Sequence, residues 1–112
     1  MSFSPEQQKE IQKLQQMQQQ FEQIRNHRMQ LERRENELKT TMETIENIED
    51  TEQIYKSVGQ LLLKTDIGTA KNDVKDELEQ LETKLISVRS SEKSLEERFQ
   101  AAQEKFRSSM GQ

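Results

Sequence analysis

Apolar residues recur at alternating intervals of three and four along two long stretches of the chain. In the first stretch they are Leu14, Met17, Phe21, Ile24, Leu31, Leu38, Met42 and Ile45. In the second they are Val74, Leu78, Leu81, Leu85, Val88, Leu95, Phe99, Ala102 and Phe106. This a/d spacing of a coiled coil predicts one helix over residues 5–49 and another over residues 70–109. Because each stripe covers only two positions in seven, we expect the two helices to pack against each other antiparallel.

Residues that break helices lie outside these two stretches, at Pro5, Gly59, Gly68 and Gly111. Before the first helix, Ser4 can cap the free amide groups and Pro5 suits the first helical position. Gln7 can complete a capping box with Ser4. For the second helix, Thr69 is the expected cap.

Three polar residues stand where the stripes require apolar ones: Arg28, Glu35 and Glu92. If the helices fold back about residues 59–60, facing residues have numbers that sum to about 118–120. Arg28 then lies near Glu92, and Glu35 lies near Lys84. One hypothesis is that such charges pair across the seam and set its register. The alternative is that these long side chains extend into water beside a thin seam.

Residues 53–65, between the helices, have the pattern of a β-hairpin. Ile54 to Val58 is β-prone, Gly59-Gln60 can turn, and Leu61 to Thr65 continues as a second strand. The three consecutive leucines place apolar side chains on both faces of that strand. A lone hairpin is barely stable in water and exposes unpaired backbone groups at its edges. The sequence therefore predicts an oligomer in which other subunits supply partner strands.

Composition supports a narrow seam rather than a conventional core. Of the 112 residues, 29% are hydrophobic and 34% are charged, which is too polar to enclose a globular interior. There is no cysteine and no apolar run of membrane-spanning length. Because Met1 to Pro5 lead straight into polar sequence, we also expect no signal peptide. A net charge of −4 argues against nucleic acid as the main partner. We expect a cytoplasmic protein that binds neither nucleic acid nor membrane.

The sequence contains no pattern that predicts an enzyme. It lacks a glycine-rich phosphate loop, and its single histidine, His27, flanks the seam where solvation is expected. Its carboxylates are spread along helix surfaces. The basic residues Arg25, Arg33 and Arg34 alternate with acidic ones, as on a solvated helix face. We expect no catalytic residue, metal site or cofactor.

The hairpin resembles that of β-type prefoldin subunits. The segment Ile54-Tyr55-Lys56-Ser57-Val58-Gly59-Gln60-Leu61-Leu62-Leu63-Lys64 is similar to the family's hydrophobic–Tyr–Lys–x–x–Gly–x–aliphatic–aliphatic–aliphatic–Lys pattern. A single hairpin separates the β type from the α type, and the compact form favours an archaeal-like member. The resemblance implies a mainly α fold over residues 1–112, a long antiparallel two-helix coiled coil joined by one hairpin. It also implies that hairpins from several subunits form a β-barrel.

By the same resemblance, the protein is an ATP-independent chaperone (a holdase). Prefoldin is a hexamer of α-type and β-type subunits that holds unfolded proteins at the coiled-coil tips and delivers them to a group II chaperonin. The implied assembly residues are Ile54, Tyr55, Val58, Gly59, Leu61, Leu62 and Leu63. The tip residues are Phe3, Ile11, Leu14, Met17, Phe99, Phe106 and Met110, and exposed Phe and Met suit binding of varied chains.

Other interpretations remain open. Leu14, Met17, Phe99 and Phe106 also fit the seam, which favours a structural role for these four, whereas Phe3, Ile11 and Met110 fit either role. A coiled-coil scaffold or tether with one dedicated partner would have the same heptads, although it would not need Leu61-Leu62-Leu63. A regulatory binding module would assemble in the same way without holding unfolded proteins.

Overall fold

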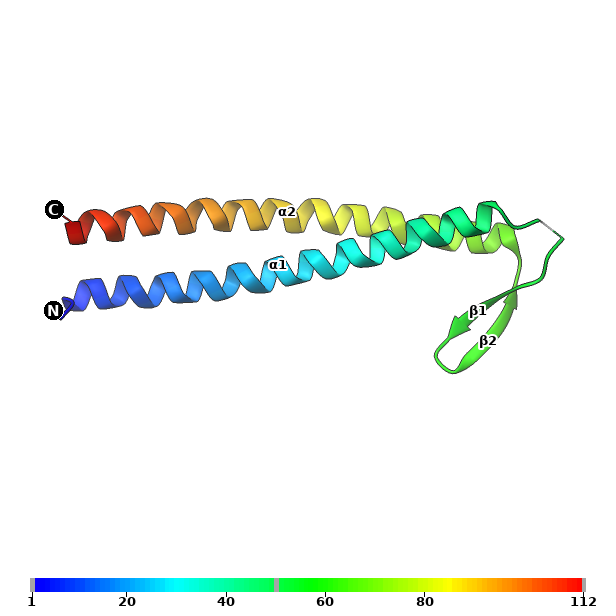
Figure 1. Cartoon of the computed structure of the whole chain (residues 1–112), viewed down its shortest axis with the longest axis horizontal. Coiled ribbons are helices and arrows are strands. Elements are labelled where there is room, and N and C mark those ends of the chain that lie inside the picture. The colour runs from blue at the N-terminus through cyan, green and yellow to red at the C-terminus, as the bar shows by residue number, and fades with distance from the viewer. Residues whose placement is uncertain (1, 50, 112) are drawn as a thin grey trace. The chain divides into compact units, whose positions relative to one another are not determined.

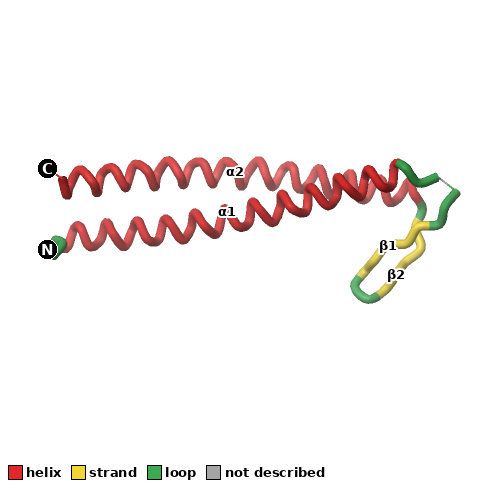
Figure 2. Tube along the Cα trace, in the orientation of Figure 1, coloured by secondary structure: helices red, strands yellow, loops and turns green. Residues whose placement is uncertain are grey.

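The computed structural model describes residues 2–49 and 51–111. Its elements are α1 (Pro5–Glu46), β1 (Ile54–Val58), β2 (Leu61–Thr65) and α2 (Ile67–Gly111), in that order (Figures 1 and 2). The fold is mainly helical, with two long helices joined by one two-stranded hairpin, as the sequence predicts.

The chain divides into two compact units, and both helices contribute to each. Residues 1–29 and 86–112 form one, which we call the terminal unit because it contains both chain ends. Residues 30–85 form the other, which we call the hairpin unit. The two units are described separately below.

Helix α1 begins with the predicted capping box. The backbone N–H of Gln7 donates to Oγ of Ser4 at 3.1 Å, and the N–H of Ser4 donates to Oε1 of Gln7 at 2.9 Å. Two amide groups that have no partner within the helix are thereby satisfied. Pro5 occupies the first helical position, where its missing N–H costs nothing.

The other end of α1 differs from the expected boundary of 49, because the helix ends at Glu46. The N–H groups of Asn47 and Ile48 donate to carbonyl groups only three residues back, at 3.2 and 3.1 Å, which closes the helix in a tighter turn. The last turn contains no basic residue, so nothing offsets the partial negative charge of the helix end.

Helix α2 begins earlier than predicted, at Ile67 instead of residue 70, and Asp66 rather than Thr69 is its cap. The Asp66 carboxylate accepts the N–H of Thr69 at 2.8 Å and its hydroxyl at 2.9 Å. An aspartate in the N-cap position is a strong helix start, and it outweighs the low helix propensity of Gly68. The helix ends at Gly111 rather than residue 109.

The hairpin has the predicted strands and turn. Its antiparallel register pairs Ile54 with Thr65 and Val58 with Leu61, which leaves Gly59 and Gln60 as a two-residue turn. Gly59 has φ 58°, a value that suits glycine as the first central residue of a type II′ turn.

Among the described residues, the buried ones are a few aliphatic side chains of the two helices. In the hairpin unit they are Leu38, Ile45, Ile67, Leu81 and Leu85, and in the terminal unit Leu95. Leu85 has no exposed surface at all. Most other seam residues are half-buried, as expected for two apolar stripes that cover each other only in part. Within the described chain, neither long helix contains a stretch apolar enough to cross a membrane.

Candidate functional site: an exposed hairpin and an aromatic helix end

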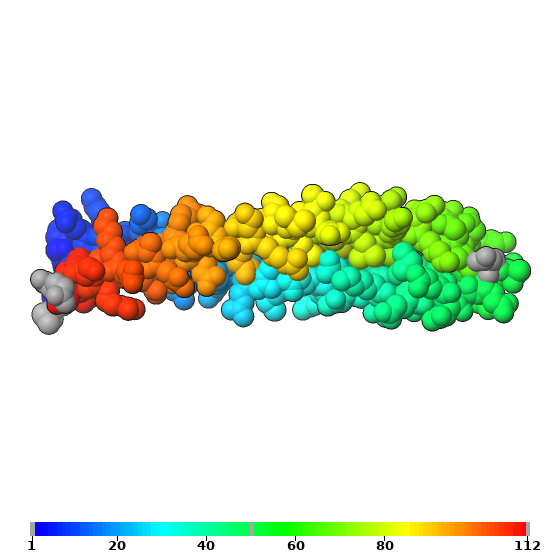
Figure 3. All heavy atoms as spheres, turned by 90° about the horizontal axis from the view of Figure 1, so that it is seen from above, coloured from blue at the N-terminus to red at the C-terminus, as the bar shows by residue number. Residues whose placement is uncertain are grey.

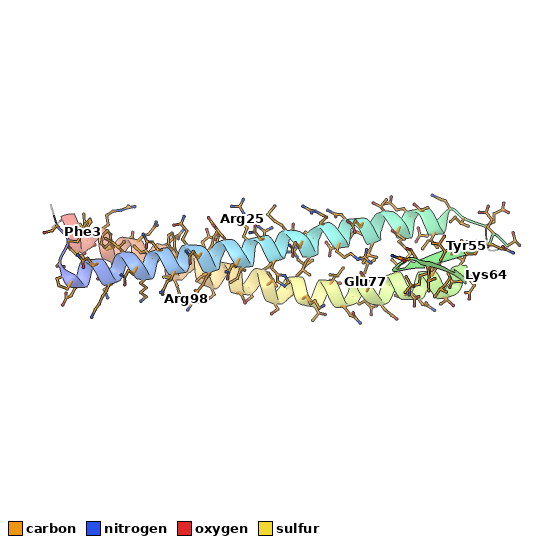
Figure 4. All side chains as sticks on the ribbon, turned by 90° about the horizontal axis from the view of Figure 1, so that it is seen from below. Phe3, Arg25, Tyr55, Lys64, Glu77 and Arg98 are labelled. Carbon is orange, nitrogen blue, oxygen red and sulfur yellow. The ribbon has the colours of Figure 1, made fainter. Side chains whose placement is uncertain are left out.

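The hairpin exposes apolar side chains on both of its faces. Residues paired across the strands share a face, so Leu61 and Leu63 lie on one face and Leu62 on the other. Leu62 is 71% exposed and Leu61 64% exposed. Tyr55 lies on the Leu62 face and is also exposed, and Figure 4 shows it near Lys64, its partner across the strands. Exposed large apolar side chains gathered on one small sheet are typical of an interaction site.

Both outer edges of the hairpin carry free backbone groups. Within the described chain β1 pairs only with β2, and β2 only with β1. A sheet edge of this kind can accept a further strand. The predicted assembly residues Ile54, Tyr55, Val58, Gly59 and Leu61–Leu63 thus belong to one small sheet with open edges and mostly exposed side chains.

An apolar groove of about 550 Å³ lies between the hairpin and the helices of the hairpin unit. Its lining includes Ile45 and Ile48 at the end of α1, Ile54 and Tyr55 of β1, and Val74 of α2. The groove means that the hairpin does not pack closely on the helices beneath it. Sequence reasoning missed this groove, because no local pattern reports the space between elements.

One ion pair connects the hairpin to α2 across the groove. Nζ of Lys56 lies 3.5 Å from Oδ2 of Asp73, and both side chains are about half exposed. An ion pair with that exposure contributes about 0–1 kcal/mol. The hairpin is therefore held in place weakly by its own chain.

In the terminal unit, the start of α1 and the end of α2 lie together. The rings of Phe3 and Phe106 are 6.2 Å apart between centroids and inclined at 50°. Figure 3 shows the start of α1, in blue, beside the end of α2, in red. Phe3 is 42% exposed and Met110 51% exposed, so this helix end presents aromatic and thioether groups to solvent.

The remaining predicted tip residues belong to the same unit. A groove of about 270 Å³ is lined by Leu14, Phe106 and Met110. A second, of about 500 Å³, includes Met17 and Leu95, and Phe99 lines a third. The seam residues among them are half-buried, as is Ile11, so they contribute to helix packing and still present apolar surface.

The polar seam residues Arg28 and Glu92 contact each other in the terminal unit. Nε of Arg28 donates to Oε2 of Glu92 at 2.5 Å, and the two side chains are only 24% and 18% exposed. Their role in setting the register remains a hypothesis. Glu35 has a different partner from the expected Lys84, since it pairs with Lys39 on its own helix at 3.6 Å.

A second ion pair crosses between the helices in the hairpin unit, and sequence reasoning did not predict it. Nε of Arg34 donates to Oε2 of Glu77 at 2.5 Å, and both side chains are substantially exposed. These hydrogen bonds hold the pKa of Glu77 below its usual range and raise that of Arg34. The predicted register, in which the numbers of facing residues sum to 118–120, therefore accounts for the contact between Arg28 and Glu92 but does not account for the contact between Arg34 and Glu77.

The described residues include no group of three or more His, Asp or Glu side chains placed to hold a metal ion. A further pKa shift belongs to a helix cap. Hydrogen bonds from the backbone N–H and the hydroxyl of Thr69 hold the pKa of Asp66 below its ordinary value.

Residues 8–112 match the family model described as prefoldin subunit. The match covers nearly the whole chain, and the chain belongs to this family.

Two related proteins are named prefoldin subunit beta. That of Methanothrix thermoacetophila is 33% identical over 63 residues, which are 56% of this chain and 52% of that protein. That of Thermococcus onnurineus is 35% identical over 57 residues, 51% of this chain and 49% of that protein. The chain thus matches about half the length of these relatives.

Two crystal structures from Thermococcus strain KS-1 share the fold. The prefoldin beta subunit superposes with a TM-score of 0.90 at 26% identity, over 99% of this chain and 97% of that one. The beta2 subunit gives a TM-score of 0.75 at 21% identity, over 82% and 98%, which is a likeness of fold alone.

Proposed function

We propose that this chain is a β-type subunit of a cytoplasmic prefoldin hexamer and acts as an ATP-independent holdase. In this proposal the hairpin joins α-type and further β-type subunits. The terminal unit binds unfolded proteins, which then pass to a group II chaperonin. No catalytic step is involved.

The observation that carries the proposal is the exposed hairpin. A two-stranded sheet with open edges and leucines on both faces is unfavourable in water. Strands from other subunits would cover Leu61, Leu62 and Leu63 and satisfy the free edges. Membership of the prefoldin subunit family supports this assignment, because it gives such a hairpin a role in assembly.

The terminal unit supports the holding of unfolded proteins. Phe3 and Met110 are exposed, and a shallow apolar groove lies next to Phe106. The groove that includes Met17 is lined by both apolar and polar side chains. Aromatic rings offer large apolar area, and methionine adapts its shape to different neighbours. Several such ends in one hexamer would bind a client through many weak contacts, each of which releases quickly.

Assembly is tested by the native mass of the complex that contains this chain. We expect a hexamer with several copies of the 13.3 kDa subunit and a longer second chain. Leu62→Ser should weaken assembly, whereas Ile86→Ser, at a residue 63% exposed on α2, should not. A stable dimer with one unrelated protein would contradict the proposal and favour the scaffold or tether.

Client binding is tested by suppression of the aggregation of a model enzyme diluted from denaturant. Deleting residues 1–12, or the double substitution Phe3→Ser with Met110→Ser, should raise the amount of hexamer needed by about threefold or more. The matched control is Met29→Ser with Ile86→Ser, because these residues are exposed to a similar degree away from the helix ends. Unchanged suppression after the deletion would refute the tip assignment and favour a binding module without chaperone activity.

A further inference from the structure

Charge is distributed unequally between the two units. The terminal unit contains nine basic and seven acidic residues, a net charge of +2. The hairpin unit contains eight basic and 14 acidic residues, a net charge of −6. The exposed apolar hairpin therefore belongs to the strongly acidic part of the protein.

One acidic segment of the hairpin unit, which contributes side chains to the groove under the hairpin, contains no basic residue. Residues 40–55 include no lysine or arginine. Glu43, Glu46, Glu49 and Glu52 are all exposed in this segment, and we call these four the acidic rim. Ile45 and Ile48, which line the groove, alternate with them in the sequence.

The acidic rim is not neutralised by the protein itself. Among the described residues, none of its four carboxylates forms an ion pair, whereas Asp73 and Glu77 are paired with Lys56 and Arg34. Glu43 and Glu46 also lie at the carboxyl end of α1, whose partial negative charge repels them. These charges weaken the helix end, and a cationic partner surface would reverse that effect.

We propose that the acidic rim selects the occupant of this face: a partner subunit that brings apolar side chains together with lysines or arginines. The inference rests on the proposed function, in which the hairpin is the assembly surface. The apolar groove and strands attract any apolar surface, including that of a second copy of this chain. A second copy, however, also brings a net charge of −6 in its hairpin unit, and like charges on the two surfaces oppose association.

Varying the salt concentration distinguishes the charge repulsion between two copies of the chain from their apolar attraction. Raising ionic strength shortens the range of charge interactions from about 10 Å at 0.1 M to about 3 Å at 1 M and leaves apolar attraction in place. Association of this chain with itself should therefore strengthen by about fivefold or more between 50 and 500 mM NaCl. Sedimentation velocity on the full chain measures this directly.

Variants with altered charge test whether the acidic rim is the source of the repulsion between two copies of the chain. Replacing the rim with E43Q, E46Q, E49Q and E52Q should strengthen self-association at 50 mM NaCl and remove most of its salt dependence. The control removes four negative charges from the terminal unit instead, through E22Q, E96Q, E97Q and E104Q, and should leave self-association as in the wild type. Equal effects of the two sets would overturn the proposal, because net charge rather than the rim would then be decisive.

A basic copy of the chain serves as the defined partner. It carries E43K, E46K, E49K and E52K and is mixed with the wild-type chain at 50 mM NaCl, and circular dichroism verifies that both remain helical. Assemblies that contain both chains should outnumber assemblies of the wild-type chain alone or of the basic copy alone by about fivefold or more. This preference for mixed assemblies should vanish at 500 mM NaCl. If the basic copy and the wild-type chain assemble with each other no more often than with themselves at low salt, the proposal is wrong. If the basic copy fails to fold, the self-association of the glutamine variants tests the proposal instead.

Failure of this inference can be told apart from failure of the proposed function. If Leu62→Ser abolishes assembly while the rim variants change nothing, the hairpin is the assembly surface and charge does not select the partner. If Leu62→Ser also leaves assembly unchanged, both proposals are wrong.

Discussion

The ion pair between Arg28 and Glu92 should contribute to stability through its burial. The side chains are 24% and 18% exposed and are joined by a hydrogen bond of 2.5 Å. Replacing one of them by methionine leaves the other charge largely out of water and without this partner. A hydrogen bond to a charged group is worth about 1.5–3 kcal/mol, so we expect each single substitution to cost about 2 kcal/mol.

The double substitution should cost much less than the two single ones together. Methionines at both positions continue the apolar stripe, and replacing a buried ion pair with apolar residues is often nearly neutral. The expected coupling energy is therefore about 2 kcal/mol.

The matched control is the pair of Arg34 and Glu77. It has the same residue types and the same 2.5 Å contact between the two helices, but its side chains are 50% and 39% exposed. An exposed pair couples by about 0.2–1 kcal/mol. Urea unfolding followed by circular dichroism measures both cycles, at one protein concentration because assembly adds to apparent stability.

If the coupling energy of Arg28 with Glu92 equals that of Arg34 with Glu77, the reasoning that burial determines the strength of an ion pair is wrong. The charge exchange Arg28→Glu with Glu92→Arg adds a test of the register hypothesis. If the pair helps to set the register, the exchanged protein should retain more stability than either single exchange.

Three further predictions concern the core, a helix cap and the hairpin turn. Leu85→Ala should cost about 3 kcal/mol in urea unfolding, because a fully buried leucine leaves a cavity, whereas Ile86→Ala, at an exposed neighbour, should change stability by about 0.5 kcal/mol or less. The lowered pKa of Asp66 means that its ionised form stabilises the fold above about pH 4, and that this stabilisation is lost as pH falls through the lowered pKa. The melting temperature of wild type should therefore decline more steeply below about pH 4 than that of Asp66→Asn, which keeps a cap that does not titrate; parallel declines would contradict this. Gly59→Ala introduces a side chain at φ 58° at a cost of about 1 kcal/mol, so assembly measured by sedimentation should weaken about fivefold, and Gly59→Asn, which tolerates positive φ better, should weaken it less.

Features that depend on neighbours along the chain were predictable from the sequence. The capping box of Ser4 and Gln7 spans three residues, and the turn at Gly59 needs one residue that adopts positive φ without strain. The end of α1 at Glu46 and the cap of α2 at Asp66 each differ from the predicted position by three residues. At these points several side chains compete to satisfy the same backbone groups, and periodicity carries no information about which one succeeds.

The candidate site was predictable in its residue types more than in its geometry. Three consecutive leucines in a two-stranded hairpin must expose apolar side chains, whatever surrounds them. The sequence also predicted that Phe3 and Phe106, which lie at opposite ends of the chain, come close together, because antiparallel helices of similar length bring the two chain ends to the same place. The contact between their rings and the groove beneath the hairpin required the tertiary structure, since both depend on spacing between separate elements.

By itself, the sequence determined two helices with narrow apolar stripes, one hairpin and their order, because hydrophobic periodicity and turn residues act over a few positions. It also indicated Arg28 and Glu92 as neighbours through the symmetry of the fold. Only the tertiary structure decided that Arg34 pairs with Glu77 and that Glu35 pairs along its own helix. Long charged side chains can reach several partners, and the one they bind depends on the distances between helices, which no local pattern contains.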